Sequence, residues 1–217
     1  MELHSGDNRS IPGMAVFSRY GTAGMEAFSR VGIMGAGATG MGIADSLLES
    51  DIPVTIYELD REPLDLATAA MRSTYQNAVC DGELTVAQRD RRVALLAATI
   101  NLHHLKDCDV IVDALHTSAA VRDGVLRRLN ELAKPGAVLI ACVSDADEDA
   151  DAEVNRIAAL MRFPENVLGM RRTNGAGSEQ WELVPAKATS ERALATATRV
   201  VQNFGMSPVV ELPPVLL

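Results

Sequence analysis

Residues 35 to 42 read Gly-Ala-Gly-Ala-Thr-Gly-Met-Gly, so a Gly-x-Gly-x-x-Gly pattern stands between an apolar run and a helix-like stretch. In such a pattern Gly35 lets the chain turn sharply off a strand, Gly37 lets a pyrophosphate approach the backbone, and Gly40 lets the next helix pack closely. The N-terminus of that helix points its unpaired N–H groups at the phosphates. The spacing therefore predicts a dinucleotide-binding loop.

An acid follows at the place where this kind of loop needs one. Glu58 closes a strand-like segment, residues 53 to 58, about 20 residues after the last glycine. A carboxylate there accepts hydrogen bonds from ribose hydroxyls and repels a 2′-phosphate, which predicts NAD rather than NADP. Arg61, three residues on, could soften that preference. A flavin site, or a structural turn without any nucleotide, is the alternative interpretation.

The elements that must position these residues alternate between helix and strand patterns. Helices at 62–79 and 85–97 meet at Asp81-Gly82 and form a hairpin between strands. The other expected helices are 119–132, a segment ending near 162, and 190–204, with strands expected at 31–34, 53–58, 99–103, 109–115, 137–143, 166–170, 181–184 and 209–212. This alternation predicts an α/β fold, a Rossmann-type doubly wound and mostly parallel sheet with an inserted helical hairpin. We expect residues 30–217 to form that domain and residues 1–29 to be a flexible extension.

Composition limits the kinds of partner. The chain has 217 residues, 47% of them hydrophobic, enough for one sizeable core. A net charge of -9 and 4% aromatic residues disfavour nucleic-acid binding, and no apolar run is long enough to cross a bilayer. Three scattered cysteines without metal-type spacing indicate reduced thiols and no metal site. We therefore expect a cytoplasmic protein, and we interpret the acidic run 145–153 as a solvated loop leading into a helix.

Several separated motifs, taken in order, resemble the NAD-binding domain of the 3-hydroxyacyl-CoA dehydrogenase family over residues 31 to 210. They are the glycine segment 35–44, Gly82-Glu83-Leu84-Thr85 at the hairpin bend, Asp109 to Ala114, Phe163 to Met170, and Ala188-Thr189-Ser190-Glu191. The resemblance implies NAD as cofactor and a small acyl substrate. It places the cofactor contacts at Gly35, Gly37, Ala38, Thr39, Gly40, Glu58, Leu115 and Thr117.

The positions that carry the family's chemistry are largely replaced. Arg171 stands where the resemblance puts a histidine that exchanges the substrate's hydroxyl proton, and arginine stays protonated at any working pH. Glu182 stands where the resemblance puts the glutamate that pairs with this histidine. Arg171 and Glu182 would therefore form a salt bridge rather than an acid–base dyad. Asn174 matches an asparagine that follows the histidine, and Cys142 matches a serine that touches the substrate oxygen. His116, after the fourth strand, is a weaker candidate for proton transfer.

Three hypotheses follow for the function. The first is an NAD-dependent oxidoreductase that acts on a hydroxyacyl or ketoacyl substrate by hydride transfer, with Arg171 orienting or polarising the oxygen. The second is a non-redox biosynthetic enzyme, a cyclase, isomerase or lyase, on the same scaffold. The third is a non-catalytic NAD-binding module. Because family members continue into a helical domain that makes their dimer, we also expect this chain to self-associate as a homo-oligomer.

Overall fold

In the computed structural model, which describes residues 29–144, 149–175, 178–203 and 209–210, the strands form one 8-stranded sheet. They are β1 (Val31–Met34), β2 (Val54–Tyr57), β3 (Leu96–Thr99), β4 (Val110–Asp113), β5 (Val138–Cys142), β6 (Val167–Gly175), β7 (Ser178–Pro185) and β8 (Val209–Val210). Their order is β3-β2-β1-β4-β5-β6-β7-β8, and only the pairing of β6 with β7 is antiparallel. The order reverses between β1 and β4, which confirms the predicted doubly wound fold.

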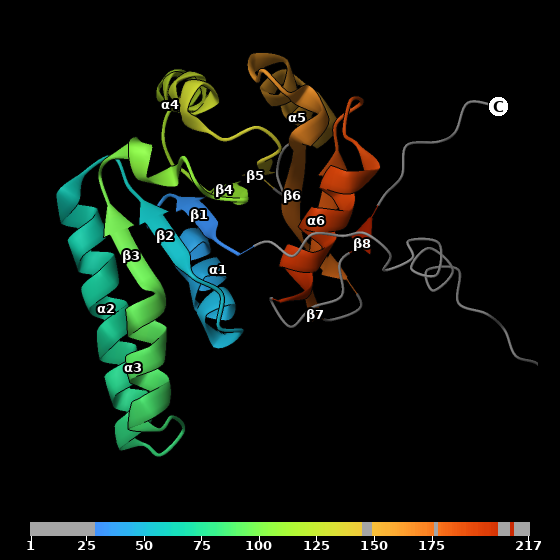
Figure 1. Ribbon diagram of the computed structural model, residues 1–217. Coiled ribbons are helices and arrows are strands. Elements are labelled where there is room, and N and C mark those ends of the chain that lie inside the picture. The colour runs from blue at the N-terminus through green and yellow to red at the C-terminus, as the bar shows by residue number, and fades with distance from the viewer. Residues whose placement is uncertain (1–28, 145–148, 176–177, 204–208, 211–217) are drawn as a thin grey trace, which may run out of the picture.

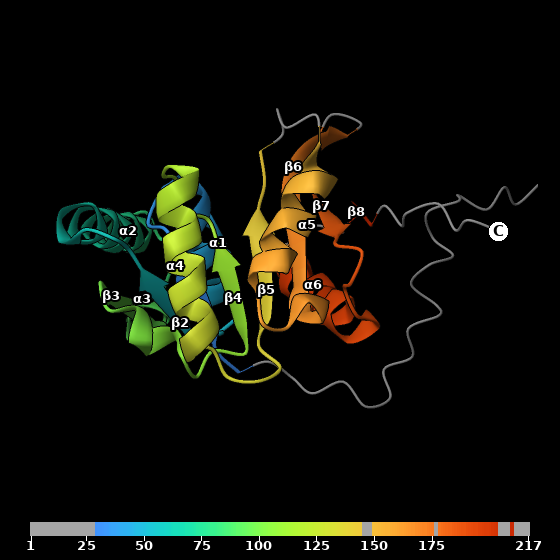
Figure 2. The ribbon, with the colours of Figure 1, turned by 90° about the horizontal axis from the view of Figure 1, so that it is seen from above.

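Helices cover both faces of this sheet (Figures 1 and 2). They are α1 (Ala38–Glu49), α2 (Arg61–Cys80), α3 (Val86–Leu95), α4 (Ala119–Leu132), α5 (Ala150–Leu160) and α6 (Glu191–Gln202), with 3₁₀ turns η2 (Leu102–Leu105) and η3 (Pro164–Asn166). One apolar cluster joins α1, α2 and α6 to the sheet, and a second joins η2, α4 and α5 to the opposite face. The central strands are buried on both faces, which explains their continuous apolar sequence.

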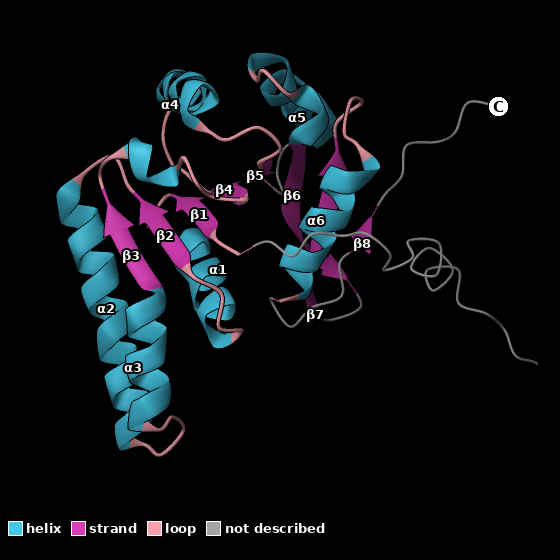
Figure 3. Cartoon of the chain, in the orientation of Figure 1, coloured by secondary structure: helices cyan, strands magenta, loops and turns pink. Residues whose placement is uncertain are grey.

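The predicted helical hairpin is present as α2 and α3, which extend away from the strands in Figure 3. Thr85 begins α3 with a reciprocal capping box to Gln88. The Tyr75 hydroxyl, on α2, donates to Asp45 Oδ1 on α1 at 2.6 Å, and the Arg92 guanidinium of α3 lies 5.5 Å from the Tyr75 ring centre. These contacts hold the hairpin against the helix that follows the glycine loop.

One expected strand, at 99–103, is wrong in position. Strand β3 ends at Thr99, and the next residues form the 3₁₀ turn η2. The chain passes directly from α3 into β3, because Leu96 must pair with Val54 at the start of β2. The Asn101 side chain then accepts a hydrogen bond from His103 N, which starts the 3₁₀ turn.

The last part of the sheet is more extensive than the sequence pattern indicated. Strand β6 continues to Gly175 because residues 168 to 175 pair with β7. The apolar pattern that predicted a strand at 166–170 did not indicate this backbone ladder. Residues 1–28 of the extension expected at 1–29, residues 145–148 of the acidic run and positions 211–212 lie outside the described residues. Within the part of the chain that is described, no helix is long and apolar enough to cross a membrane.

Candidate functional site

The glycine loop has the backbone geometry that its sequence predicts. Gly35 has φ +106°, a left-handed conformation, and a Cβ there would lie 2.4 Å from the Ala114 carbonyl oxygen. A Cβ on Gly40 would lie 2.0 Å from the Gly35 oxygen. Gly37, in contrast, is exposed and meets nothing within 4 Å. Two glycines therefore allow close packing, and the third leaves the backbone open on its outer side.

That open glycine is the N-cap of α1, and it supplies no side-chain cap to the first turn. The first N–H groups of α1, from Ala38 and Thr39 onward, therefore have no side-chain cap. They give this helix end a partial positive charge, which favours phosphate. Glu58, directly after β2, accepts a hydrogen bond from the Ala36 N–H at 2.8 Å through Oε2. The acid thus lies beside the loop, and the residues present fit an adenosine pyrophosphate.

Strand register aligns the carboxyl ends of the central strands. Met34, at the end of β1, pairs with Asp113 of β4, Asp113 pairs with Ala141 of β5, and Ala141 pairs with Gly169 of β6. The residues that follow this row lie at one edge of the sheet. They include Gly35, Cys142 and Arg171, so the structure brings the predicted cofactor loop and two of the predicted chemical residues to the same edge.

Arg171 and Glu182 form a bidentate ion pair across the antiparallel strands β6 and β7. They are directly opposite in register, with Arg171 Nε 2.7 Å from Oε2 and Nη2 3.1 Å from Oε1 of Glu182. The side chain of Glu182 is only 7% exposed, whereas that of Arg171 is 28% exposed. A nearly buried carboxylate therefore orients a cation that reaches the solvent at the sheet edge.

The remaining predicted residues lie in the segment after β4 and along β6. Leu115, in the segment after β4, donates its backbone N–H to Asp113 at 3.2 Å, while His116 and Thr117 are exposed beyond it. Asn174 pairs with Glu179 in the backbone ladder of β6 and β7, far along the hairpin from the row of strand ends. Their roles stay predictions.

Cys142 ends β5 opposite Met170. Burial of the thiol, and then the charge of Asp113, raises the pKa of Cys142 to about 12, although Arg122 acts in the opposite direction. A thiol with that pKa carries almost no thiolate at neutral pH, so the structure gives no support to a nucleophilic cysteine.

A buried ion network behind this edge was missed by sequence reasoning. Asp113, which is fully buried, accepts from Arg122 Nε at 2.6 Å, and Arg122 Nη2 also donates to the Cys142 carbonyl oxygen at 3.2 Å. Glu153, at the start of α5, lies 3.5 Å from Arg122 Nη1. The available signal was an acid at the end of an apolar strand, since a buried carboxylate needs a cationic partner.

This network connects the segment after β4 to the end of β5. Burial raises the pKa of Asp113 even though Arg122 stabilises the ionised form. Asp113 also holds the Leu115 N–H, so the carboxylate orders the segment that leads to His116. Arg122 is therefore a positioning residue for the loop that borders the predicted cofactor.

A comparison with protein families gives one match to the described fold. Residues 30–212 match the model of the "3-hydroxyacyl-CoA dehydrogenase, NAD binding domain". The match includes the glycine loop, Glu58 and the edge that carries Arg171. Its extent agrees with the resemblance seen in the sequence motifs.

Individual relatives agree with that match. The chain is 29% identical over 172 residues to a Mycobacterium tuberculosis 3-hydroxybutyryl-CoA dehydrogenase, covering 78% of this chain and 58% of that protein. It is 26% identical over 179 residues to a Psychrobacter fatty acid oxidation complex subunit alpha, covering 82% of this chain and 24% of that protein. The chain therefore spans less than two thirds of the length of these curated relatives.

Solved structures show the same similarity in three dimensions. The crystal structure of M. tuberculosis FadB2 superposes with a TM-score of 0.74 at 27% identity, covering 86% of this chain and 64% of that chain. The Ralstonia eutropha (S)-3-hydroxybutyryl-CoA dehydrogenase PaaH1 gives a TM-score of 0.73 at 19% identity, over 85% of this chain and 63% of that chain. The second likeness supports the fold alone.

Proposed function

The chain belongs to the 3-hydroxyacyl-CoA dehydrogenase family through its NAD-binding domain, and on that premise we propose that it is an NAD-dependent oxidoreductase acting on a hydroxyacyl or ketoacyl substrate. The cofactor is NAD, for which the glycine loop and Glu58 provide the binding residues. NAD supplies the hydride donor or acceptor when it is bound. The observation that carries the proposal is the Arg171–Glu182 pair at the edge where the glycine loop lies.

Arg171 binds and polarises the substrate oxygen in this proposal. Its guanidinium is held by two hydrogen bonds to a nearly buried carboxylate, so its orientation costs little entropy when substrate arrives. A fixed cation stabilises negative charge that develops on a carbonyl oxygen during its reduction. Arginine does not supply the proton that the reduced oxygen needs, because its guanidinium stays protonated. Proton transfer therefore falls to another group, and exposed His116 is the candidate on this edge.

The substrate class is proposed from the relatives, two of which are named as acting on 3-hydroxybutyryl-CoA. The hairpin helix in this chain carries only Arg72 as a basic residue between positions 62 and 84. Few cations are thus available there for the phosphates of CoA, so a free or carrier-bound substrate is as consistent with this helix as a CoA thioester. We also propose that the protein is cytoplasmic and forms a homo-oligomer.

One experiment separates these statements. NADH consumption is followed by absorbance with acetoacetyl-CoA, a carrier-type thioester and free 3-keto acids, using wild type, Arg171→Lys and Glu182→Gln. We expect turnover with at least one substrate and a loss of about 100-fold in kcat for Arg171→Lys, because lysine loses the bidentate bond. Arg162→Lys, on an exposed residue before β6, is the matched control.

A non-redox enzyme is the second candidate, favoured by the permanent cation at the position of the expected base. NAD binding without any change in NADH absorbance across the substrate panel would contradict oxidoreductase activity. Turnover of a pathway intermediate with unchanged cofactor would then support a cyclase, isomerase or lyase. If no turnover is found, a stable complex with a full-length dehydrogenase would support a non-catalytic module.

A further inference from the structure

A pocket of about 370 Å³ lies beside β2 and β3, and it shares no residue with the glycine loop or with the edge that carries Arg171. It lies under the connection from β3 to β4, which contains the short turn η2, and both histidines of η2 line it. The buried hydroxyl-bearing residues Thr55 and Thr99 belong to its wall, together with the small side chain of Ala97.

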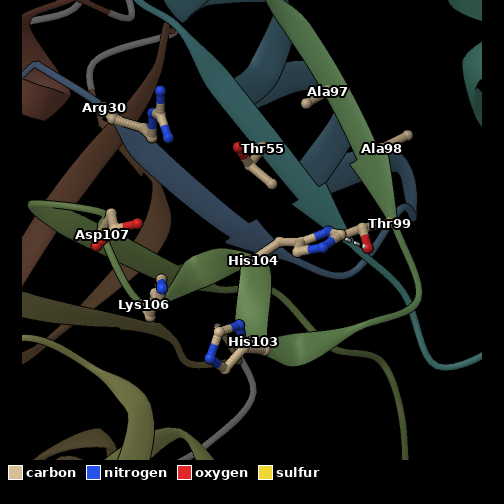
Figure 4. Close-up of a pocket in the computed structure, with 9 residues that line it drawn as sticks. All are labelled: Arg30, Thr55, Ala97, Ala98, Thr99, His103, His104, Lys106 and Asp107. Carbon is tan, nitrogen blue, oxygen red and sulfur yellow. Dashed lines mark hydrogen bonds between the residues drawn. The ribbon is translucent and has the colours of Figure 1, made fainter.

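Four of the nine residues that line this pocket are basic. Arg30 precedes β1, His103 and His104 belong to η2, and Lys106 follows η2, so the four residues come from two separate segments (Figure 4). Asp107 is the one acidic residue that lines it. The lining is therefore cationic in a chain whose formal net charge is -9.

One of the imidazoles is held in place. The Thr99 hydroxyl lies 2.8 Å from His104 Nδ1, which orients the ring and leaves Nε2 for another partner (Figure 4). The other charged residues that line the pocket, Arg30, Lys106 and Asp107, are exposed. Within the described residues the side chains of Arg30 and Lys106 form no hydrogen bond or ion pair. By comparison, Arg122 and Arg156 are both paired with acids.

We propose that this pocket binds a small phosphate monoester dianion. Two full cations match its two charges, and the oriented His104 imidazole and the Thr55 hydroxyl offer hydrogen bonds to the phosphate oxygens. The volume is within the range of small-molecule sites, about 300 to 1,000 Å³, and near its lower limit, which suits a phosphorylated metabolite better than a dinucleotide. The small side chains of Ala97 and Ala98 leave room for the organic part of the ester.

Calorimetric titration of the full chain with glycerol 3-phosphate tests the proposal. Saturating NAD is present, so that the phosphate site at the glycine loop is filled. Neutral glycerol is the control ligand, and inorganic phosphate tests whether the organic part contributes. We expect binding of the ester, weaker binding of inorganic phosphate and none of glycerol.

Variants locate the binding. Arg30→Gln and Lys106→Gln should each weaken it about tenfold, since each removes a charge-assisted hydrogen bond. Asp107→Asn should tighten it several-fold by removing the opposing charge, a gain that a purely structural role does not produce. Arg72→Gln and Lys187→Gln remove exposed cations elsewhere and should leave it unchanged.

The proposal is overturned if the ester does not bind at millimolar concentration, or if the pocket variants behave like the two control variants. Equal affinity for glycerol 3-phosphate and inorganic phosphate would overturn the assignment of a monoester. Circular dichroism of each variant shows that it is folded, which is expected because the substituted side chains are exposed.

Discussion

Arg122 Nε lies 2.6 Å from Asp113 Oδ2, and this bond joins the helix after β4 to the last residue of that strand. Asp113 is fully buried, and Arg122 is 13% exposed. The pair lies behind the edge where the glycine loop and Arg171 are found. It is therefore both a stability element and a support for the candidate site.

Replacing Arg122 with methionine should destabilise the protein by about 3–5 kcal/mol, because the Asp113 carboxylate is then buried without a counter-charge. The pKa of Asp113 is already raised by burial, and the substitution raises it further. Protonation of Asp113 removes the buried charge. The loss in free energy of unfolding, relative to the wild type, should therefore shrink as the pH falls through that pKa. Urea unfolding between pH 5 and 8 measures the effect.

The double variant Arg122→Met with Asp113→Leu is the control for that prediction. It removes both charges and should recover much of the lost stability. Equal stability of the wild type and Arg122→Met at neutral pH would show that the pair does not support the fold.

Gly40→Ala should weaken NAD binding more than tenfold and destabilise the protein by roughly 1–3 kcal/mol, since the added Cβ would lie 2.0 Å from the Gly35 oxygen. The same substitution at Gly42, on the same helix, meets nothing within 4 Å. Gly42→Ala should therefore stabilise the helix by about 0.5–1 kcal/mol without changing affinity. Thermal unfolding and NADH fluorescence titration test both. Similar behaviour of the two variants would contradict the packing argument.

Glu58→Ala should weaken NAD binding about tenfold and reduce the discrimination against NADP. The carboxylate accepts the Ala36 N–H at 2.8 Å, so the variant loses loop order as well as a ribose acceptor. Affinities for NADH and NADPH measured side by side provide the test. Glu83→Ala, an exposed acid at the hairpin bend, is the control. If Glu58→Ala leaves the ratio of the affinities for NADH and NADPH unchanged, another residue determines the selectivity.

Only one of the three cysteines should react rapidly with iodoacetamide at pH 8. Cys80 is exposed, whereas burial raises the pKa of Cys108 to about 11 and that of Cys142 to about 12. Little thiolate is then present at the two latter positions. Mass spectrometry after a short labelling time gives the site. Rapid labelling at Cys142 would contradict the raised pKa of that thiol.

Local sequence pattern was sufficient for the glycine loop, the α2–α3 hairpin and the alternation of strands with helices, because these depend on glycine geometry, turn residues and apolar periodicity. It was insufficient for β3, whose position is set by pairing with β2. It also missed the length of β6, which depends on the ladder to β7. Strand limits of this kind are decided by partners distant in the sequence.

The sequence by itself determined the family's cofactor loop and the replacement of the expected histidine by Arg171. The tertiary structure decided that Arg171 and Glu182 meet as a bidentate pair, since antiparallel register places residues 11 positions apart directly opposite each other. It also decided that Arg122 neutralises Asp113 and that a basic pocket opens beside η2. Charge pairing and cavities depend on distances between separate segments, and those distances exist only after the sheet and its two helical layers have assembled.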